Sequence, residues 1–322
     1  MGCHCAPMCF VVWKVGLKMI KNTLFGPLTL LAGVLIFSTN GFWQAIAPEG
    51  NTPYVIGASR LVIGGMTLSF WCLIRYGKIR LHGWDWMAIG IYAVALWLYQ
   101  IFFFQGVHLI GVAIGTVIAV GSTPIFTGLI QAFLYKDKPD FLWYIATVLA
   151  IGGLILVNMV EGVDFAWYAV ILPLLAGLTL AVSVIVAPRV AQPHSAEEGM
   201  TIAMLIAACL MLPFFFIFPT EWIFTPRGAL CVGMLGVVNA ALGFTLELVG
   251  FKNTPTLIAS TLTLGEPLGA ALIGVFVLEE PYTAESLAGI VLLFLSILLL
   301  IVGPELKRRV AWRRFNKVAF RE

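Results

Sequence analysis

Charged side chains are scarce in this sequence of 322 residues. Asp, Glu, Lys and Arg together make up 11% of the residues, whereas hydrophobic residues make up 61%. A typical soluble domain has roughly a quarter charged residues, so the composition excludes a water-soluble globular enzyme. The apolar content also excludes intrinsic disorder, and a net charge of only +3 argues against a nucleic-acid-binding surface. The sequence therefore predicts a polytopic membrane protein that contacts the lipid bilayer and no nucleic acid.

Motifs for catalysis and for cofactor binding are missing as well. The sequence has no His-Glu-x-x-His segment, no phosphate-binding P-loop and no acidic cluster suited to metal–phosphate chemistry. The six cysteines show no spacing typical of a disulfide framework. We therefore expect no enzyme activity, no cofactor and no metal. Because no nucleotide-binding segment is present, any transport would be driven by a gradient of ions or substrate.

Long segments without charge are present instead. A helix needs about 20 apolar residues to cross a hydrocarbon core of about 30 Å. The charge-free segment 86–135 would extend about 75 Å as one helix, so it must contain two, with a break near Gly106–Gly111. The predicted spans are 22–48, 54–74, two within 86–135, 141–160, 165–187, 199–219, 228–250, 255–278 and 286–303. The predicted fold class is an all-α polytopic membrane protein of ten transmembrane helices, because open strand edges cannot face lipid.

Lysine and arginine are distributed unevenly among the connecting segments. Ten crossings place both termini on one side, and the short loops on that side carry nearly all of the loop Lys and Arg, whereas the opposite loops carry only Arg227. The positive-inside rule then predicts a protein of the plasma membrane with both termini cytoplasmic. The basic run within residues 307–321 is interpreted as a topology anchor against anionic lipid, with a regulatory or protein-binding role as the alternative.

The two halves of the sequence correspond at an offset of about 143 residues. Pro124 matches Pro267, and the acidic end at Asp137 matches Glu280. Each half has five helices, an odd number, so the halves must insert with opposite orientation. Inverted repeats are typical of secondary transporters. The predicted organisation is a cytoplasmic N-terminal tail (1–23), a first repeat (24–160), a second repeat (161–303) and a basic cytoplasmic tail (304–322). Residues 1–18 are interpreted as a tail without function or as the result of a misplaced start before Met19.

These features resemble the EamA family of the drug/metabolite transporter superfamily. The resemblance rests on Arg60, Pro124, Glu266-Pro267 and the acidic ends at Asp137 and Glu279-Glu280, and it covers about residues 24–303. It implies a central cavity lined largely by helices 1, 3, 4, 6, 8 and 9, and export of amino acids or other small metabolites by alternating access. One departure is Tyr135-Lys136-Asp137, where the family often has Gly-Glu, although Asp137 keeps an acid there.

Three ionisable residues lie inside predicted spans, namely Arg60, Glu247 and Glu266. Such a group costs about 2.5–3.5 kcal/mol on insertion scales, so each is a functional candidate. Each also has a structural interpretation: Arg60 as a lock on backbone carbonyls, Glu247 as a group that reaches the inner interface, and Glu266 as a support for the backbone around Pro267. Their depths predict that Arg60 can reach Glu266 but not Glu247. Because burial disfavours a charged carboxylate, Glu266 is also the candidate for proton coupling.

Neutral polar and aromatic residues complete the predicted substrate pathway. They are Asn40, Trp43 and Gln44 in the first span, Trp97, Tyr99 and Gln100 in the third, Thr116 and Thr123 in the fourth, Ser183 in the sixth, and Asn239 and Gly243 in the eighth. The alternative for these positions is ordinary helix packing. We also predict helix breaks at Pro124 and Pro267, because proline removes a helix hydrogen bond, and the freed carbonyls could bind a substrate ammonium group.

The sequence thus predicts an alternating-access secondary transporter that exports small organic metabolites, with amino acids or similar amphipathic compounds as the predicted substrates. Its expected partners are a small-molecule substrate, the bilayer and protons as a coupling ion, and its expected state is a monomer or homodimer. The first rival interpretation is a facilitative exchanger for phosphorylated or nucleotide-linked metabolites, which would need more buried cations than Arg60. The second is a small-molecule channel or a non-transporting membrane partner.

Overall fold

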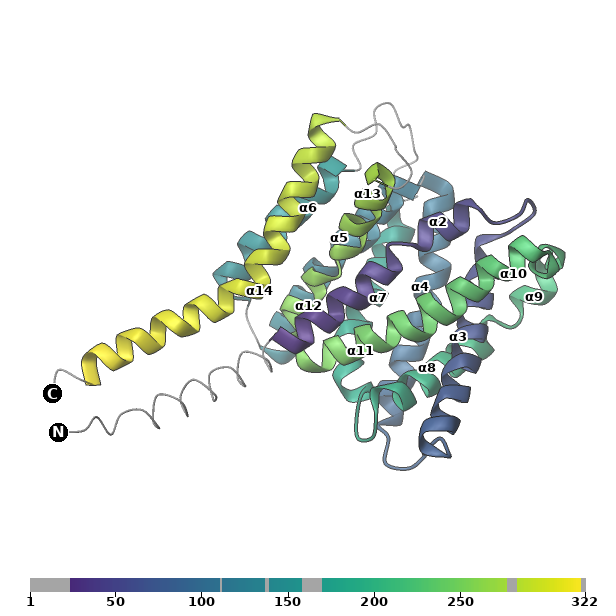
Figure 1. Cartoon of the computed structure of the whole chain (residues 1–322), viewed down its shortest axis with the longest axis horizontal. Coiled ribbons are helices and arrows are strands. Elements are labelled where there is room, and N and C mark those ends of the chain that lie inside the picture. The colour runs from purple at the N-terminus through teal and green to yellow at the C-terminus, as the bar shows by residue number, and fades with distance from the viewer. Residues whose placement is uncertain (1–23, 111, 137–138, 158–169, 277–282, 320–322) are drawn as a thin grey trace, which may run out of the picture.

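The chain folds as a bundle of helices (Figure 1). The computed structural model describes residues 24–110, 112–136, 139–157, 170–276 and 283–319, and every regular element in these ranges is helical. The predictions that concern residues 1–23, Asp137, Glu279 and Glu280 lie outside the described residues, as do the side chains of the basic tail after Gly303.

The first half contains five membrane-spanning segments. The first comprises helical residues 24–37, a turn at residues 38–39 and the short helix α2 (Asn40–Ala45). The others are α3 (Pro53–Tyr76), α4 (Trp86–Ile110), α5 (Val112–Ile130) with its π-helical extension η1 (Gln131–Tyr135), and α6 (Phe141–Val157). Within 86–135, Trp86–Gly106 and Gly115–Tyr135 are each long and apolar enough to cross a membrane, so the segment contains two spans as predicted, whereas residue 111 of the predicted break lies outside the described residues.

The second half repeats this order. It contains α7 (Ile171–Val190), α8 (Ala196–Met211) followed by α9 (Phe214–Ile217) and η3 (Glu221–Phe224), and then α10 (Pro226–Gly233), which continues through the π-helix η4 (Met234–Gly243) into α11 (Phe244–Asn253). The last elements are α12 (Thr256–Leu262), α13 (Gly265–Phe276) and α14 (Ala284–Ala319). Helix α14 continues into the predicted basic tail.

The lengths and composition of the helices agree with the predicted fold class. Among the described residues, nine helices are long and apolar enough to cross a membrane, and Phe141–Val157 is a shorter apolar helix. Several ends follow from local sequence signals: Ser195 caps α8 by accepting a hydrogen bond from Glu198 N at 3.2 Å, and Gly77 ends α3 with a left-handed φ of 71°. The all-helical prediction is confirmed.

Glycine contacts relate the two halves at the predicted offset. A β-carbon at Gly106 in α4 would approach Pro173 of α7 to 2.7 Å, and one at Gly250 in α11 would approach Leu30 of the first span to 2.5 Å. Leu30 and Pro173 are 143 positions apart, and Gly106 and Gly250 are 144 apart. The first helix of each half therefore packs against the third helix of the other half, as two interchangeable inverted repeats require.

The fifth helices of the two halves also pair through glycine. Helices α6 and α14 lie side by side at the left of Figure 1. A β-carbon at Gly153 would lie 2.7 Å from Gly289 O, and one at Gly289 would lie 2.6 Å from Gly153 O. The two backbones approach so closely here that neither position leaves room for a side chain.

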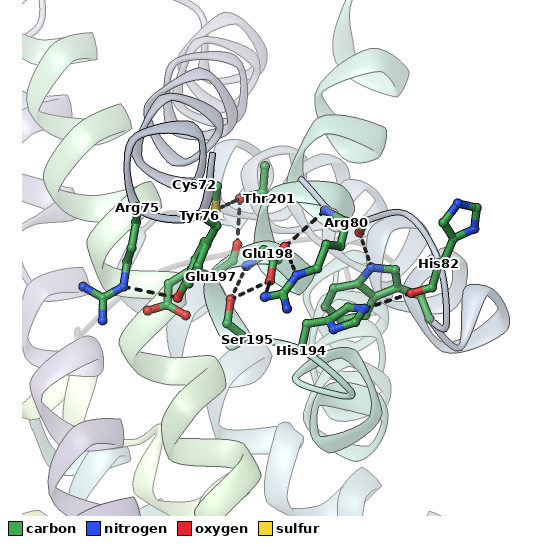
Figure 2. Close-up of polar contacts among 11 residues, drawn as sticks. Cys72, Arg75, Tyr76, Arg80, His82, His194, Ser195, Glu197, Glu198 and Thr201 are labelled. Atoms are coloured by element: carbon green, nitrogen blue, oxygen red, sulfur yellow. Dashed lines mark hydrogen bonds and ion pairs between the residues drawn. The ribbon is translucent and has the colours of Figure 1, made fainter. Parts of the chain in front are cut away.

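The loop between α3 and α4 is held to the start of α8 by an ion pair (Figure 2). Arg80 donates from Nε to Glu198 Oε1 at 3.0 Å and from Nη2 to Oε2 at 2.6 Å, and its backbone N–H donates to Oε1 at 3.1 Å. The Glu198 side chain is fully buried, whereas that of Arg80 is 39% exposed. The hydrogen bonds with Glu198 raise the pKa of Arg80 above its ordinary value, so the pair stays charged.

Candidate functional site

A cavity of about 440 Å³ lies between the two halves of the bundle. Its wall comes from the first span, α4, α5, α7, α11 and the α12–α13 segment, with Arg60 added by α3. These are helices 1, 3, 4, 6, 8 and 9 of the expected ten, so the cavity has the lining that the EamA resemblance implied. The additional element is the second helix, which contributes a positive charge.

Most of the predicted pathway residues line this cavity. They are Asn40, Gln44, Arg60, Tyr99, Gln100, Thr116, Ser183, Glu247 and Glu266, together with Pro267. The structure thus brings together residues from seven separate segments of the chain. All three ionisable residues of the predicted spans are among them.

The remaining predicted residues lie outside the cavity wall and contribute to helix packing. A β-carbon at Gly243 would approach the Phe37 ring to 2.7 Å. The Thr123 hydroxyl is buried and donates to Ala119 O at 3.1 Å. Trp43 packs against an apolar cluster that includes Val55 and Trp222, and Trp97 packs against the main core. Asn239 accepts a hydrogen bond from Arg60.

Arg60 is fixed by an amide and two aromatic rings. Its side chain is 6% exposed, and Nη2 donates to Asn239 Oδ1 at 3.0 Å. The guanidinium lies 5.2 Å from the Phe37 ring centroid and 4.9 Å from that of Phe244, within the range of a cation–π interaction. Side chains, rather than the predicted backbone carbonyls, therefore hold Arg60 in place. Arg60 Nε has no hydrogen-bond partner in the described part of the chain.

Asn239 is itself held in one orientation. Its Nδ2 donates to Ile36 O at 2.9 Å and to Thr39 Oγ1 at 3.1 Å, both in the first span. With both amide hydrogens used, Oδ1 is turned toward Arg60. Asn239 lies in the π-helix η4, an irregular segment of the kind that often occurs at functional sites.

Two carboxylates share the cavity with Arg60. Glu247 is 5% exposed and lines the wall, so the interpretation in which it reaches the inner interface is wrong. The Asn40 side chain is a hydrogen-bond partner of the Glu266 carboxyl group. Arg60 interacts electrostatically with Glu266 first and with Glu247 to a smaller extent. The cavity therefore combines one guanidinium with two carboxyl groups.

The two prolines behave differently. The ninth span is interrupted between α12 and α13 at residues 263–264, because the Pro267 ring clashes with the carbonyl four residues earlier, that of Thr263. The carbonyl freed by Pro267 is already used, since Glu266 N donates to Thr263 O at 3.1 Å. The Glu266 carbonyl in turn accepts from Ser38 Oγ at 2.9 Å. Substrate binding by freed carbonyls at this break is therefore not supported.

At Pro124 the predicted break is absent, since α5 runs through this residue. The turn before Pro124 packs closely against α7, because Gly177 has no side chain and Ser122 lies directly against the Gly177 backbone. Thr123 Oγ1 also lies 3.5 Å from Gly177 O. Close packing by a neighbouring helix lets a membrane helix continue through proline.

Aromatic residues form much of the cavity wall, and the sequence reasoning missed them. They are Phe37, Tyr92, Phe103, Phe104, Phe244 and Phe251. With 23 phenylalanines in the chain, a Phe in an apolar helix has no distinguishing feature. A signal was nevertheless present in α4, where Tyr92, Leu96, Tyr99 and Phe103 recur at helical spacing on the face of Tyr99.

The cavity wall is aromatic and buried at one end and polar at the other. Tyr92, near the start of α4, and Phe251, near the end of α11, are each 2% exposed. At the opposite end the wall is formed by Asn40 and Gln44 and by Asn51 from the loop between the first two spans. The polar end of the cavity therefore lies nearest the loop of residues 46–52.

Comparisons with known proteins agree with this architecture. A family model described as the EamA-like transporter family matches residues 24–159 and 167–302. The uncharacterized transporter YwfM of Bacillus subtilis is 33% identical over 288 residues, which cover 88% of this chain and 96% of that protein. The threonine/homoserine exporter RhtA of Escherichia coli K12 is 25% identical over 251 residues, covering 76% and 80%.

A solved crystal structure gives the same fold. It superimposes with a TM-score of 0.74 at 18% sequence identity and covers 85% of this chain and 97% of the other. The two matched repeats, the named transporters and the inverted packing of the two halves lead to one conclusion. The chain belongs to the EamA-like transporter family, as a multi-pass integral membrane protein.

Proposed function

We propose that this protein is an alternating-access exporter of free amino acids. The observation that carries the proposal is the cavity, in which a guanidinium and two carboxylates are surrounded by aromatic side chains. A zwitterionic head with an apolar or hydroxylated side chain matches such a wall in charge and in polarity. The relatives named threonine/homoserine exporters support the same substrate class and the same direction of transport.

The charges of the cavity argue against phosphorylated substrates. Among the described lining residues, Arg60 is the one permanent cation, and it shares the cavity with Glu247 and Glu266. A phosphate dianion carries two negative charges, of which Arg60 can balance only one in a medium of low dielectric, where uncompensated charge is costly. A zwitterion introduces no net charge and avoids this cost.

We assign the protein to the plasma membrane with both termini in the cytoplasm, following the positive-inside rule. In this orientation the loop that carries Arg80 is cytoplasmic and the loop of residues 46–52 is external. The polar end of the cavity, opposite Tyr92 and Phe251, then lies toward the outside. In an exporter this end is the one through which the substrate leaves.

Proton exchange is the proposed driving force. Glu266 lines the cavity beside Asn40, where a carboxyl group can bind either a proton or a substrate ammonium group. Binding that is mutually exclusive at one carboxylate couples outward movement of substrate to inward movement of a proton. Glu266 is chosen over Glu247 because it interacts more strongly with Arg60.

Counterflow in proteoliposomes tests the proposal. Vesicles containing the purified protein are loaded with a pool of the twenty proteinogenic amino acids, and uptake of each labelled amino acid is measured at pH 6 and pH 8. Saturable counterflow of at least one amino acid, absent from protein-free vesicles, is the expected result. Uptake that is proportional to concentration and shows no counterflow would indicate a channel. No flux of any amino acid through folded protein would overturn the proposal.

A further inference from the structure

Four buried polar atoms around the cavity have no hydrogen-bond partner in the described ranges. They are Arg60 Nε, Gln100 Nε2, Gln100 Oε1 and Asn40 Oδ1. All three residues line the cavity. Native proteins rarely leave such groups unpaired, because a buried donor or acceptor loses its bonds to water without replacement. These atoms therefore indicate positions that a bound ligand would complete.

Gln100 is the most unusual of the three. Its side chain is 1% exposed, and both ends of its amide lack a partner among the described residues. The amide lies against Gly57 of α3: a β-carbon there would be in ordinary contact with Gln100 Oε1, at 3.6 Å, and closer to the Phe104 ring, at 3.2 Å. An amide with no structural bond to make is poorly explained by packing alone.

Gln100 and Arg60 both belong to the part of the cavity wall beside α3. Gly57, which Gln100 faces, precedes Arg60 by three residues on α3, which corresponds to one side of the helix and about 4.5 Å of rise. The unpaired donors of this region are Arg60 Nε and Gln100 Nε2. Two N–H donors, one of them charged, are the pattern that binds a carboxylate.

A different unpaired acceptor, Asn40 Oδ1, lies at the polar end of the cavity. Asn40 Oδ1 has no partner in the described part of the protein, and the other end of the same amide meets the carboxyl group of Glu266. A neutral carbonyl oxygen beside a carboxylate is suited to an ammonium group, which has three donors and no acceptor. One part of the wall therefore offers two unpaired N–H donors together with Gln100 Oε1, and another offers Asn40 Oδ1 beside the Glu266 carboxyl group, which suits the two ends of a zwitterion.

The geometry points to a two-part head-group site, in which Arg60 and Gln100 bind the α-carboxylate of the substrate and Asn40 and Glu266 bind its ammonium group. This inference rests on the proposed amino-acid export and makes it specific: the carrier selects free α-amino acids over their esters, which lack the negative charge, and over the corresponding amines, which lack the carboxylate. Gln100 is the specificity-determining residue, because Arg60 alone would attract any anion.

Binding to the purified full chain tests this selectivity without variants. L-threonine and L-phenylalanine are each compared by isothermal titration with their methyl esters and with the matching amines, 1-amino-2-propanol and phenethylamine. Loss of the bonds to a charged group should weaken binding roughly tenfold or more. Equal affinity for the amino acid and its amine overturns the two-part site.

Variants of Gln100 provide the second measurement. Gln100→Glu places a negative charge against the substrate carboxylate, so the preference should shift from the amino acid toward the amine, whereas Gln100→Leu should only remove the preference. Gln105→Glu is the matched control, because Gln105 lies on the same helix outside the cavity wall and its Oε1 accepts a hydrogen bond from Tyr54, which a carboxylate also accepts. The control should keep the preference of the original protein.

The outcomes separate this inference from the function on which it rests. Amino-acid counterflow without a preference for the free carboxylate overturns the head-group site and leaves the exporter standing. Absence of counterflow for every amino acid overturns the exporter and the head-group site together. A preference that survives Gln100→Leu overturns the role of Gln100.

Discussion

The glycine pair between α6 and α14 allows a sharp test of the packing. In Gly153→Ala the new methyl group would meet Gly289 O at 2.7 Å, Leu293 N at 2.9 Å and Leu292 Cβ at 3.0 Å. Two of these atoms belong to the backbone, so they cannot turn aside as a flexible side chain can. Ordinary contact begins near 3.5 Å, and the two helices would therefore have to separate by roughly 0.8 Å.

The expected cost follows from this separation. Overpacking of a well-packed interior costs about 1–3 kcal/mol, and a gap of this size forfeits about a quarter to a half of the dispersion energy along the interface. Replacing glycine by alanine within a helix returns about 0.5–1 kcal/mol. We therefore expect Gly153→Ala to lower the free energy of unfolding by about 1–2 kcal/mol.

The adjacent glycine is the matched control. A β-carbon at Gly152 would have no atom within 4 Å, so Gly152→Ala should leave the free energy of unfolding unchanged or raise it by up to about 1 kcal/mol. Unfolding of the purified protein with increasing dodecyl sulfate in mixed micelles compares the two variants. Neither residue lines the cavity, so amino-acid affinity should stay constant in both.

Equal stability of the two variants would refute the reasoning, because it would mean that α6 and α14 are not in backbone contact. A second check uses Gly289→Ala. Once one methyl group has separated the helices, the second meets less resistance, so the double variant should lose less stability than the sum of the single variants. Strict additivity would contradict a shared contact.

Three further predictions concern polar groups. Asn239→Leu removes the acceptor of Arg60, so amino-acid affinity measured by isothermal titration should fall roughly tenfold, since a bond to a charged group is worth about 1.5–3 kcal/mol; unchanged affinity would contradict this role. Glu198→Gln removes the charge that binds Arg80 outside the cavity, so the melting temperature should fall while affinity is retained, and a fall in both would argue for a wider disturbance. Glu266→Gln should make counterflow equal at pH 6 and pH 8 in protein that still reaches the membrane; persistent pH dependence would exclude Glu266 as the proton site.

The main architecture could be predicted from the sequence because lipid imposes strong constraints. A polar backbone must form helices in lipid, so charge-free segments give the spans directly. The offset of 143 residues, read from Pro124 and Pro267, reappears in the contacts of Leu30 and Pro173. An odd number of helices in each half fixes their inverted relation without further information.

The details of the cavity could not be predicted to the same extent, because hydropathy does not say which face of a helix meets its neighbours. The sequence assigns Glu247 a depth but no direction, and the structure turns it into the cavity. Pro124 and Pro267 look equivalent in the sequence, yet only the second interrupts its helix, since packing of α7 against Ser122 supports the first. Such outcomes depend on contacts between distant segments.

The bonds of Asn239 have a consequence for how the molecule can move. This one amide joins the first span through Ile36 and Thr39 and joins α3 through Arg60, while it is itself part of η4. Separate movement of the first span, α3 and η4 would break these hydrogen bonds, each worth about 0.5–3 kcal/mol, so concerted movement of the three segments costs less. Because the three segments come from both repeats, such a movement would not follow the boundary between the two homologous halves.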